Sequence, residues 1–195
     1  MPSNFVEPSA LRAQLAQRMG ELYRREVPRF TQLLEIVEAA NADTLRARGD
    51  ERCDDAAYVA AVSAQRHGAI RVGSPAELAV LARLFAQYAM EPVGFYDLVP
   101  AGLPVYSTAF RPVTTDGLTA SPFRVFCSLL RPELIDDVAV REKLGGALAT
   151  RRIVAARLEA LIEGAEARGG VDGEDAEEFL SLSVDVFRWS GRARV

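Results

Sequence analysis

The residues with the clearest chemical potential are His67, the only histidine of the 195-residue chain, and Arg71, four positions later in the segment QRHGAIRVG. Side chains alternate along an extended strand, so His67, Ala69 and Arg71 would share one face. The two outer Cα atoms would lie about 13 Å apart, at about 3.3 Å per residue, with only small Ala69 between them. An imidazole can bind a divalent iron, and a guanidinium fork can bind a carboxylate. The same spacing also fits a surface or hydrogen-bonded histidine, because one imidazole cannot form a two-histidine, one-carboxylate iron site.

Three other side chains could take part in nucleophilic chemistry, and all would depend on the same histidine. Ser107 and Ser128 need an activating base, which only His67 could provide. Cys127 could pair with His67, but it belongs to an apolar strand pattern that favours a place in the core. The glycines show no phosphate-loop spacing. These alternatives therefore stay weaker than a histidine-arginine site.

The composition narrows the class of protein. The formal net charge of −4 and the lack of a basic cluster argue against a nucleic-acid partner. No apolar run approaches 18 residues and no signal-peptide pattern opens the chain, so neither a membrane span nor secretion is expected. Cys53 and Cys127 match no ligand spacing and suggest reduced thiols. We expect a globular protein of the cytoplasm.

Residues 1–55 are expected to be helical. Ser9 can cap a first helix, and Pro28 separates it from a second one. The polar segment 47–55 is the most probable internal boundary by its turn-rich composition. The expected apolar positions are Leu11, Leu15, Met19 and Leu22 in the first helix, and Leu33, Leu34, Val37 and Leu45 in the second.

The periodicity changes over residues 65–130. A strand at 67–72 is followed by a helix at 74–90, with Ser74 as N-cap, Pro75 at its first position and Pro92 as its end. Further strands are predicted at 93–98, 103–113 and 123–130. This βαβββ order is that of one unit of the vicinal-oxygen-chelate fold, an analogy that rests on element order.

Residues 131–189 are again expected to be helical. A long helical run closes on Gly169 and Gly170, and a final helix runs from near Asp172 to Trp189. The chain as a whole, 1–195, is thus predicted to be one α+β domain in which helices flank a single βαβββ unit.

Several segments resemble one enzyme family. They are ELYRREVPRFTQLLEIVEAAN, QRHGAIRVGSPAELAVLARLFAQYAMEPVGFYDL, STAFRPV, SPFRVFCSLLRPELID and FRW, and together they cover nearly all of residues 4–189. The sequence is similar to the 2-oxoadipate dioxygenase/decarboxylase family, also called hydroxyglutarate synthase. The resemblance implies a vicinal-oxygen-chelate-like core and non-haem Fe(II). It also implies conversion of 2-oxoadipate and O₂ to 2-hydroxyglutarate and CO₂ in lysine breakdown.

The resemblance gives roles to the opening pair of residues. It implies that His67 is the first iron ligand and touches the substrate, and that Arg71 binds a substrate carboxylate. Members of the family are about twice as long, and their second histidine and glutamate ligands come from beyond the FRW segment. We therefore expect the N-terminal half of such an enzyme, with an incomplete iron site and no activity by itself, and a missing C-terminal half as partner.

Two other readings remain open. The chain could be a non-catalytic binding half that pairs with a partner through an exposed sheet. Alternatively, a homodimer could assemble a site from two copies of His67, with the carboxylate ligand supplied from elsewhere.

Overall fold

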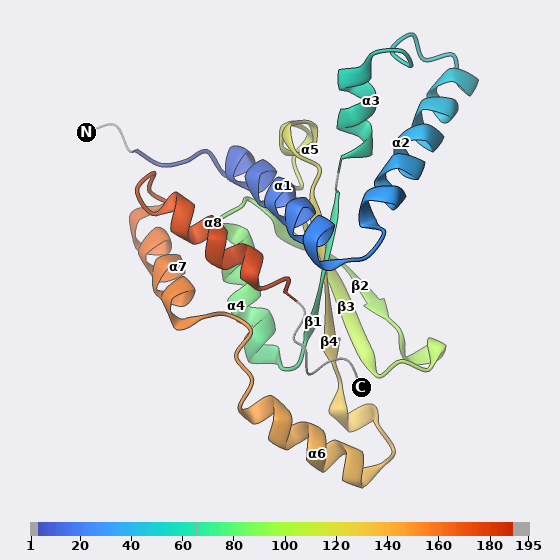
Figure 1. The fold of residues 1–195 in the computed structure, drawn as a ribbon. Coiled ribbons are helices and arrows are strands. Elements are labelled where there is room, and N and C mark those ends of the chain that lie inside the picture. Colours follow the sequence, from blue (N-terminus) through green and yellow to red (C-terminus); the bar gives the residue numbers. More distant parts are fainter. Residues whose placement is uncertain (1–3, 65, 189–195) are drawn as a thin grey trace.

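A four-stranded mixed sheet forms the centre of the computed structural model, which describes residues 4–64 and 66–188 (Figure 1). The strand order is β1-β4-β3-β2. β1 runs parallel to β4, whereas β3 is antiparallel to both β4 and β2. The strands are β1 (His67–Val72), β2 (Glu91–Asp97), β3 (Val105–Arg111) and β4 (Arg124–Leu130).

Eight α-helices and two short 3₁₀ helices accompany the sheet in the described ranges. The α-helices are α1 (Pro8–Glu26), α2 (Phe30–Ala47), α3 (Ala56–Ser63), α4 (Pro75–Ala86), α5 (Thr115–Ala120), α6 (Val138–Ala149), α7 (Ala156–Arg168) and α8 (Ala176–Asp185). The 3₁₀ helices are η1 (Val99–Ala101) and η2 (Pro132–Leu134). None of the described helices is both long and apolar enough to cross a membrane.

The core lies between one face of the sheet and the helices α1, α4, α7 and α8, which share one side of it (Figure 1). β1 shows why: its residues alternate between exposed and buried, and Ile70 and Val72 face the helices. Fully buried side chains such as Leu15, Phe85 and Phe179 meet them there. Burial of this apolar surface is the main driving force for folding, at about 25 cal/mol per Å². The opposite face of the sheet carries both polar and apolar side chains.

The predicted βαβββ unit is confirmed, with α4 as the crossover between β1 and the other strands. Ser74 accepts a hydrogen bond from the Glu77 amide, as expected for an N-cap. The predicted helix at 74–90 is, however, too long. α4 ends at Ala86, Ala89 has a positive φ of 49°, and Pro92 already belongs to β2.

The N-terminal helices differ from the prediction in two respects. The side chain that caps α1 is Glu7 rather than Ser9, and its carboxylate accepts from the Ser9 amide. α2 and α3 form a hairpin that projects from the body of the molecule (Figure 1). Leu33 is 53% exposed, so the predicted apolar side of the second helix is only partly buried.

Two short helices lie where no helix was predicted. α3 follows the polar segment 47–55, and Asp55 caps it by accepting from two backbone amides. α5 occupies the predicted turn between β3 and β4, where Thr114 accepts from the Gly117 amide. Local capping groups therefore turn both segments into single short helices.

The C-terminal third contains separate helices instead of one long run. α6 ends at Ala149 and α7 begins at Ala156, with Val154 buried between them. α7 closes at Gly169, whose φ of 88° is the left-handed conformation predicted for this C-cap. α8 ends at Asp185, and the predicted end of the last helix at Trp189 lies outside the described residues.

Candidate functional site

The face of the sheet that points away from the helices is called here the open face. Its first strand carries His67, Ala69 and Arg71, all exposed, while the alternate residues of β1 are buried. The shared face predicted for His67 and Arg71 is therefore present. The register between strands extends the face with Arg124, Phe126 and Ser128 of β4, Ser107, Ala109 and Arg111 of β3, and Glu91, Val93 and Tyr96 of β2.

Two polar rows cross this face. At one end, His67 is the direct cross-strand partner of Arg124. At the other end, Arg71 partners Ser128, Ser128 partners Ser107, and Ser107 partners Tyr96. The two serine hydroxyls of this second row are hydrogen-bonded to each other at 2.8 Å.

An aromatic side chain lies between the two rows. The ring of Phe126 stacks on His67, with a centroid distance of 6.2 Å and an interplanar angle of 19°. On its other side it meets the edge of Tyr96 at 6.4 Å. The open face is thus an apolar floor between a histidine-arginine end and an arginine-serine end.

The surroundings of His67 favour its neutral form. Partial burial is the main cause that holds the pKa of His67 below its usual value, and the cations of Arg124 and Arg66 add to it. The Nε atoms of Arg124 and Arg66 are both buried and have no hydrogen-bond partner among the described residues. A neutral imidazole is the form that binds metals.

The backbone that carries these groups is fixed from the helix side. Gly68 leaves no room for a Cβ atom, which would lie 2.7 Å from Phe187 Cε1 and 2.9 Å from Met19 Sδ. At the far end of β1, Arg151 donates a hydrogen bond to the Arg71 carbonyl at 2.6 Å. These contacts hold the edge strand β1 against the rest of the molecule.

Arg12 fixes the segment that leads into β4. Its buried guanidinium donates to the carbonyls of Ser121, Tyr88 and Gly117 at 2.9, 2.6 and 2.8 Å. Burial of the guanidinium lowers the pKa of Arg12, and the negative charge of Glu7 opposes this effect only in part. One side chain of α1 therefore ties together the turn after α4, the first part of α5 and the residue that follows α5, shortly before Arg124.

The other predicted nucleophiles do not pair with His67. Cys127 lies on the opposite face of β4 and is buried in the core, where burial raises the pKa of its thiol to about 12. Its expected place in the core is confirmed, and a pair with His67 is wrong. Ser128 is beside Arg71, not His67, and bonds to Ser107, so a serine-histidine pair is wrong as well.

The described residues do not form a complete metal centre. Within residues 4–64 and 66–188, no group of three or more histidine, cysteine, aspartate or glutamate side chains could hold an ion. His67 fits one position of an iron site by its exposure and its lowered pKa, but the described residues provide no group that would fill the other positions. No step that depends on a metal can be derived from these residues alone.

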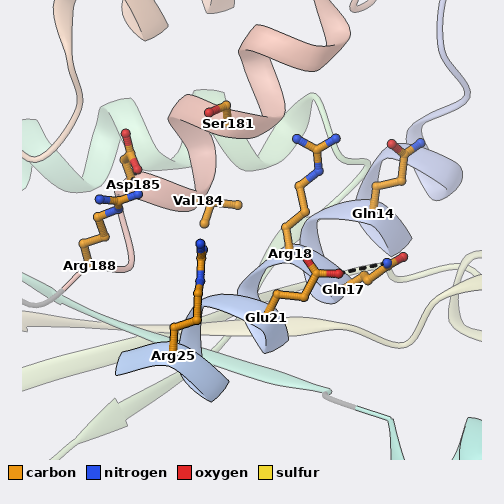
Figure 2. Close-up of a pocket in the computed structure, with 9 residues that line it drawn as sticks. All are labelled: Gln14, Gln17, Arg18, Glu21, Arg25, Ser181, Val184, Asp185 and Arg188. Atoms are coloured by element: carbon orange, nitrogen blue, oxygen red, sulfur yellow. Dashed lines mark hydrogen bonds and ion pairs between the residues drawn. The ribbon is translucent and has the colours of Figure 1, made fainter. Parts of the chain in front are cut away.

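A separate hollow of about 480 Å³ lies between α1 and α8, on the helix side (Figure 2). Arg18, Arg25 and Arg188 enter it, and Figure 2 shows Gln17 bonded to Glu21 along its rim. Arg18 forms a bidentate pair with Glu177, and Arg188 pairs with Asp185. The charged side chains that line this hollow largely compensate one another, so the hollow is a weaker candidate site than the open face.

Sequence reasoning did not identify Arg124, Phe126 or Tyr96 as part of the site. Alternation in FRVFCSLL would have placed Arg124, Phe126 and Ser128 on one face. Their position next to β1 depends on a parallel register between distant segments, for which a single sequence carries no local signal. Tyr96 joins the face only after an irregularity in the β2–β3 pairing between Val93 and Tyr96.

Comparison with known proteins places the chain in an enzyme family. The family model described as 2-oxoadipate dioxygenase/decarboxylase matches residues 15–195. A curated protein of that name from Pseudomonas putida is 46% identical over 207 residues, which cover all of this chain and 43% of the relative. The chain thus spans less than half the length of the curated relatives it matches.

Solved structures give the same result for the fold. The crystal structure of hydroxyglutarate synthase from Pseudomonas putida in complex with 2-oxoadipate superposes with a TM-score of 0.85 at 44% identity, covering 96% of this chain and 42% of that one. A putative glyoxalase superfamily protein from Ralstonia eutropha gives a TM-score of 0.50 at 19% identity, over 79% of this chain and 49% of that one. The second likeness concerns the fold alone and supports the vicinal-oxygen-chelate-like architecture.

Proposed function

This chain belongs to the 2-oxoadipate dioxygenase/decarboxylase family, and we propose that it supplies the substrate-binding face and one metal ligand of such an enzyme. The reaction proposed is 2-oxoadipate plus O₂ giving 2-hydroxyglutarate and CO₂, as a step of lysine breakdown in the cytoplasm. The observation that carries the proposal is the placement of His67 and Arg71 on one exposed face of β1, within a chain 46% identical to a named relative.

His67 is the residue that would hold non-haem Fe(II). Partial burial and neighbouring cations favour its neutral form, in which an unprotonated ring nitrogen can bind a metal. Bound iron would supply the redox chemistry with O₂ and polarise the 2-oxo acid. The remaining ligands would come from polypeptide outside this chain, which is also the partner we propose.

The protein side chains bind and orient the substrate. Arg71 offers a charge-assisted hydrogen-bond fork to a carboxylate, and Ser128 and Ser107 place two hydroxyls beside it. Phe126 gives the aliphatic part of the substrate an apolar surface between Arg71 and His67. The face therefore suits a small acid with an aliphatic chain.

A chimaera tests this function. In it, the present chain replaces the matching segment of the Pseudomonas putida relative, and O₂ uptake and CO₂ release with 2-oxoadipate are measured. We expect an active chimaera whose turnover falls at least about a hundredfold with His67→Ala, because an iron ligand is lost. Arg152→Gln, an exposed change with no described partner, is the matched control.

A folded chimaera that binds Fe(II) but leaves 2-oxoadipate unchanged would contradict the proposed reaction. It would favour the second candidate, a non-catalytic half that binds a partner through its sheet. The observation behind that candidate is the exposure of large apolar side chains in β2 and in the connection after it, where Phe95 is 69% and Leu103 51% exposed.

A further inference from the structure

We propose that Arg124 is a second carboxylate-binding residue, which holds the substrate carboxylate nearest His67 while Arg71 holds the distal one. The open face would then select short dicarboxylic 2-oxo acids over monocarboxylic ones. This inference rests on the function proposed above and assigns a role to a residue of β4 that lies beside the histidine.

The position of Arg124 is the first argument. Arg124 and His67 are direct partners on the parallel strands β4 and β1, and both side chains belong to the open face. Side chains of such partners stand next to each other, at the usual spacing of neighbouring strands of about 4.8 Å. A group bound at the imidazole is therefore within reach of the guanidinium.

The unused hydrogen-bond donor of Arg124 is the second argument. Its Nε is buried and lacks a hydrogen-bond partner among the described residues. Several exposed arginines of this chain are matched by carboxylates, as in the bidentate pairs Arg83–Glu166 and Arg157–Glu178. Buried donors are nearly always satisfied in folded proteins, so an anionic acceptor bound at this point would complete the site.

The surrounding charge supports an anion. Among the described strand residues of the open face, the acidic one is Glu91, which is the register partner of Arg111 rather than of Arg124. The His67 row is thus more positive than negative on the side nearest β1. A carboxylate bound beside His67 would interact with the guanidinium of Arg124, which has no carboxylate partner among the described residues.

The spacing of the two arginines sets the substrate class. Arg124 is level with His67, and Arg71 lies four residues further along the same direction, about 13 Å at about 3.3 Å per residue. Two long guanidinium side chains that lean towards each other leave room for a short diacid between them. Phe126 lies between the two rows and would contact its methylene groups. A monocarboxylic acid would engage only one of the two arginines.

Calorimetry on the purified chain tests this assignment, under anaerobic conditions with Fe(II) present. The probes are 2-oxoadipate, its monocarboxylic counterpart 2-oxohexanoate, and adipate, which lacks the keto group. We expect Arg124→Gln to weaken binding of both 2-oxo acids at least about tenfold, because it removes the charge that holds their shared carboxylate. Arg71→Gln should weaken 2-oxoadipate alone.

Two variants guard against misfolding as an explanation. Arg124→Lys keeps the charge and should recover part of the affinity, and Arg152→Gln should bind like the unchanged chain. If Arg124→Gln melts at a lower temperature, the affinities of Arg124→Lys and the unchanged chain are compared instead. Lysine keeps the charge but cannot reproduce the guanidinium fork, so this comparison shows which of the two binds the carboxylate. Equal affinity of Arg124→Lys and the unchanged chain would then leave the charge, not the fork, as the binding element.

The possible results separate the two proposals. Unchanged affinities in Arg124→Gln, together with weakened 2-oxoadipate binding in Arg71→Gln, would overturn the role of Arg124 and leave the proposed function standing. Adipate binding as tight as that of 2-oxoadipate, and dependent on Arg124, would support the carboxylate role but count against a 2-oxo acid function. No binding of any probe by the unchanged chain would overturn the role of Arg124 proposed here, while O₂ uptake and CO₂ release by the chimaera test the proposed function separately.

Discussion

His67 and Arg124 are direct cross-strand partners on two parallel strands, and the ring of the histidine stacks on Phe126 two residues further along β4. Partial burial of the imidazole and, to a smaller extent, the nearby cations of Arg124 and Arg66 hold the pKa of His67 below its usual value. The surroundings of the histidine that we propose as a metal ligand therefore favour its neutral form, which is the form that binds metals.

The titration of His67 should respond to Arg124. Arg124→Gln removes one of the charges that lower the pKa of His67, so this pKa should rise towards its ordinary value. Because the chain has a single histidine, its imidazole signals in an NMR pH titration are assigned without ambiguity. Arg152→Gln is the control, and an identical His67 titration in both variants would refute the electrostatic coupling.

The same shift predicts how stability depends on pH. A histidine whose pKa is lower in the folded state binds fewer protons there than in the unfolded chain, so folding is penalised once the unfolded histidine becomes protonated. The contribution of His67 to stability should be intact above the ordinary histidine pKa and decline as the pH falls below it. Urea unfolding at several pH values should show a smaller decline in Arg124→Gln.

Arg12→Met should destabilise the protein strongly. The substitution removes three hydrogen bonds to carbonyls, two of them buried, and we expect a loss of about 2–4 kcal/mol in the free energy of unfolding. Arg18→Met, on the same helix, breaks an exposed pair with Glu177 and should cost at most about 1 kcal/mol. Equal losses for the two variants in urea unfolding would mean that Arg12 does not anchor α5 and α4.

Gly68→Ala should also lower stability, by about 1–3 kcal/mol, because its Cβ would overlap Phe187 and Met19. Gly145→Ala is the control, and it should raise the stability. Nothing lies within 4 Å of its new Cβ, and alanine in a helix interior is favoured by about 0.5–1 kcal/mol. The two midpoints of thermal unfolding should move in opposite directions, and a stabilising Gly68→Ala would show that the strand can shift at no cost.

Much of the βαβββ unit could be predicted because its signals are local. The alternation in HGAIRV gave both the strand and the common face of His67 and Arg71, and Ser74 with Pro75 marked the start of α4 correctly. The end of α4 was wrong because Pro92 looked like a helix stop. In fact α4 ends at Ala86 and the chain turns at Ala89. Neither residue is of a type that is typical of a helix end.

The site was less predictable than the fold because its members come from four strands. Arg124 becomes the neighbour of His67 only through parallel pairing across a long intervening segment, and Tyr96 only through an irregular step in β2. Similarly, α2 has a helical apolar pattern, yet Leu33 remains exposed, because burial depends on what the helix meets in space rather than on its own periodicity.

The parallel pairing of β1 with β4 has a consequence for folding. β2, β3 and β4 follow one another and can pair through short connections, whereas β1 must close a much longer loop to reach β4. Contacts between distant segments are the slow ones to form. A partly folded chain that had kept the three-stranded meander would still lack the His67–Arg124 pair, so ligand binding at this face should report on completion of the whole domain.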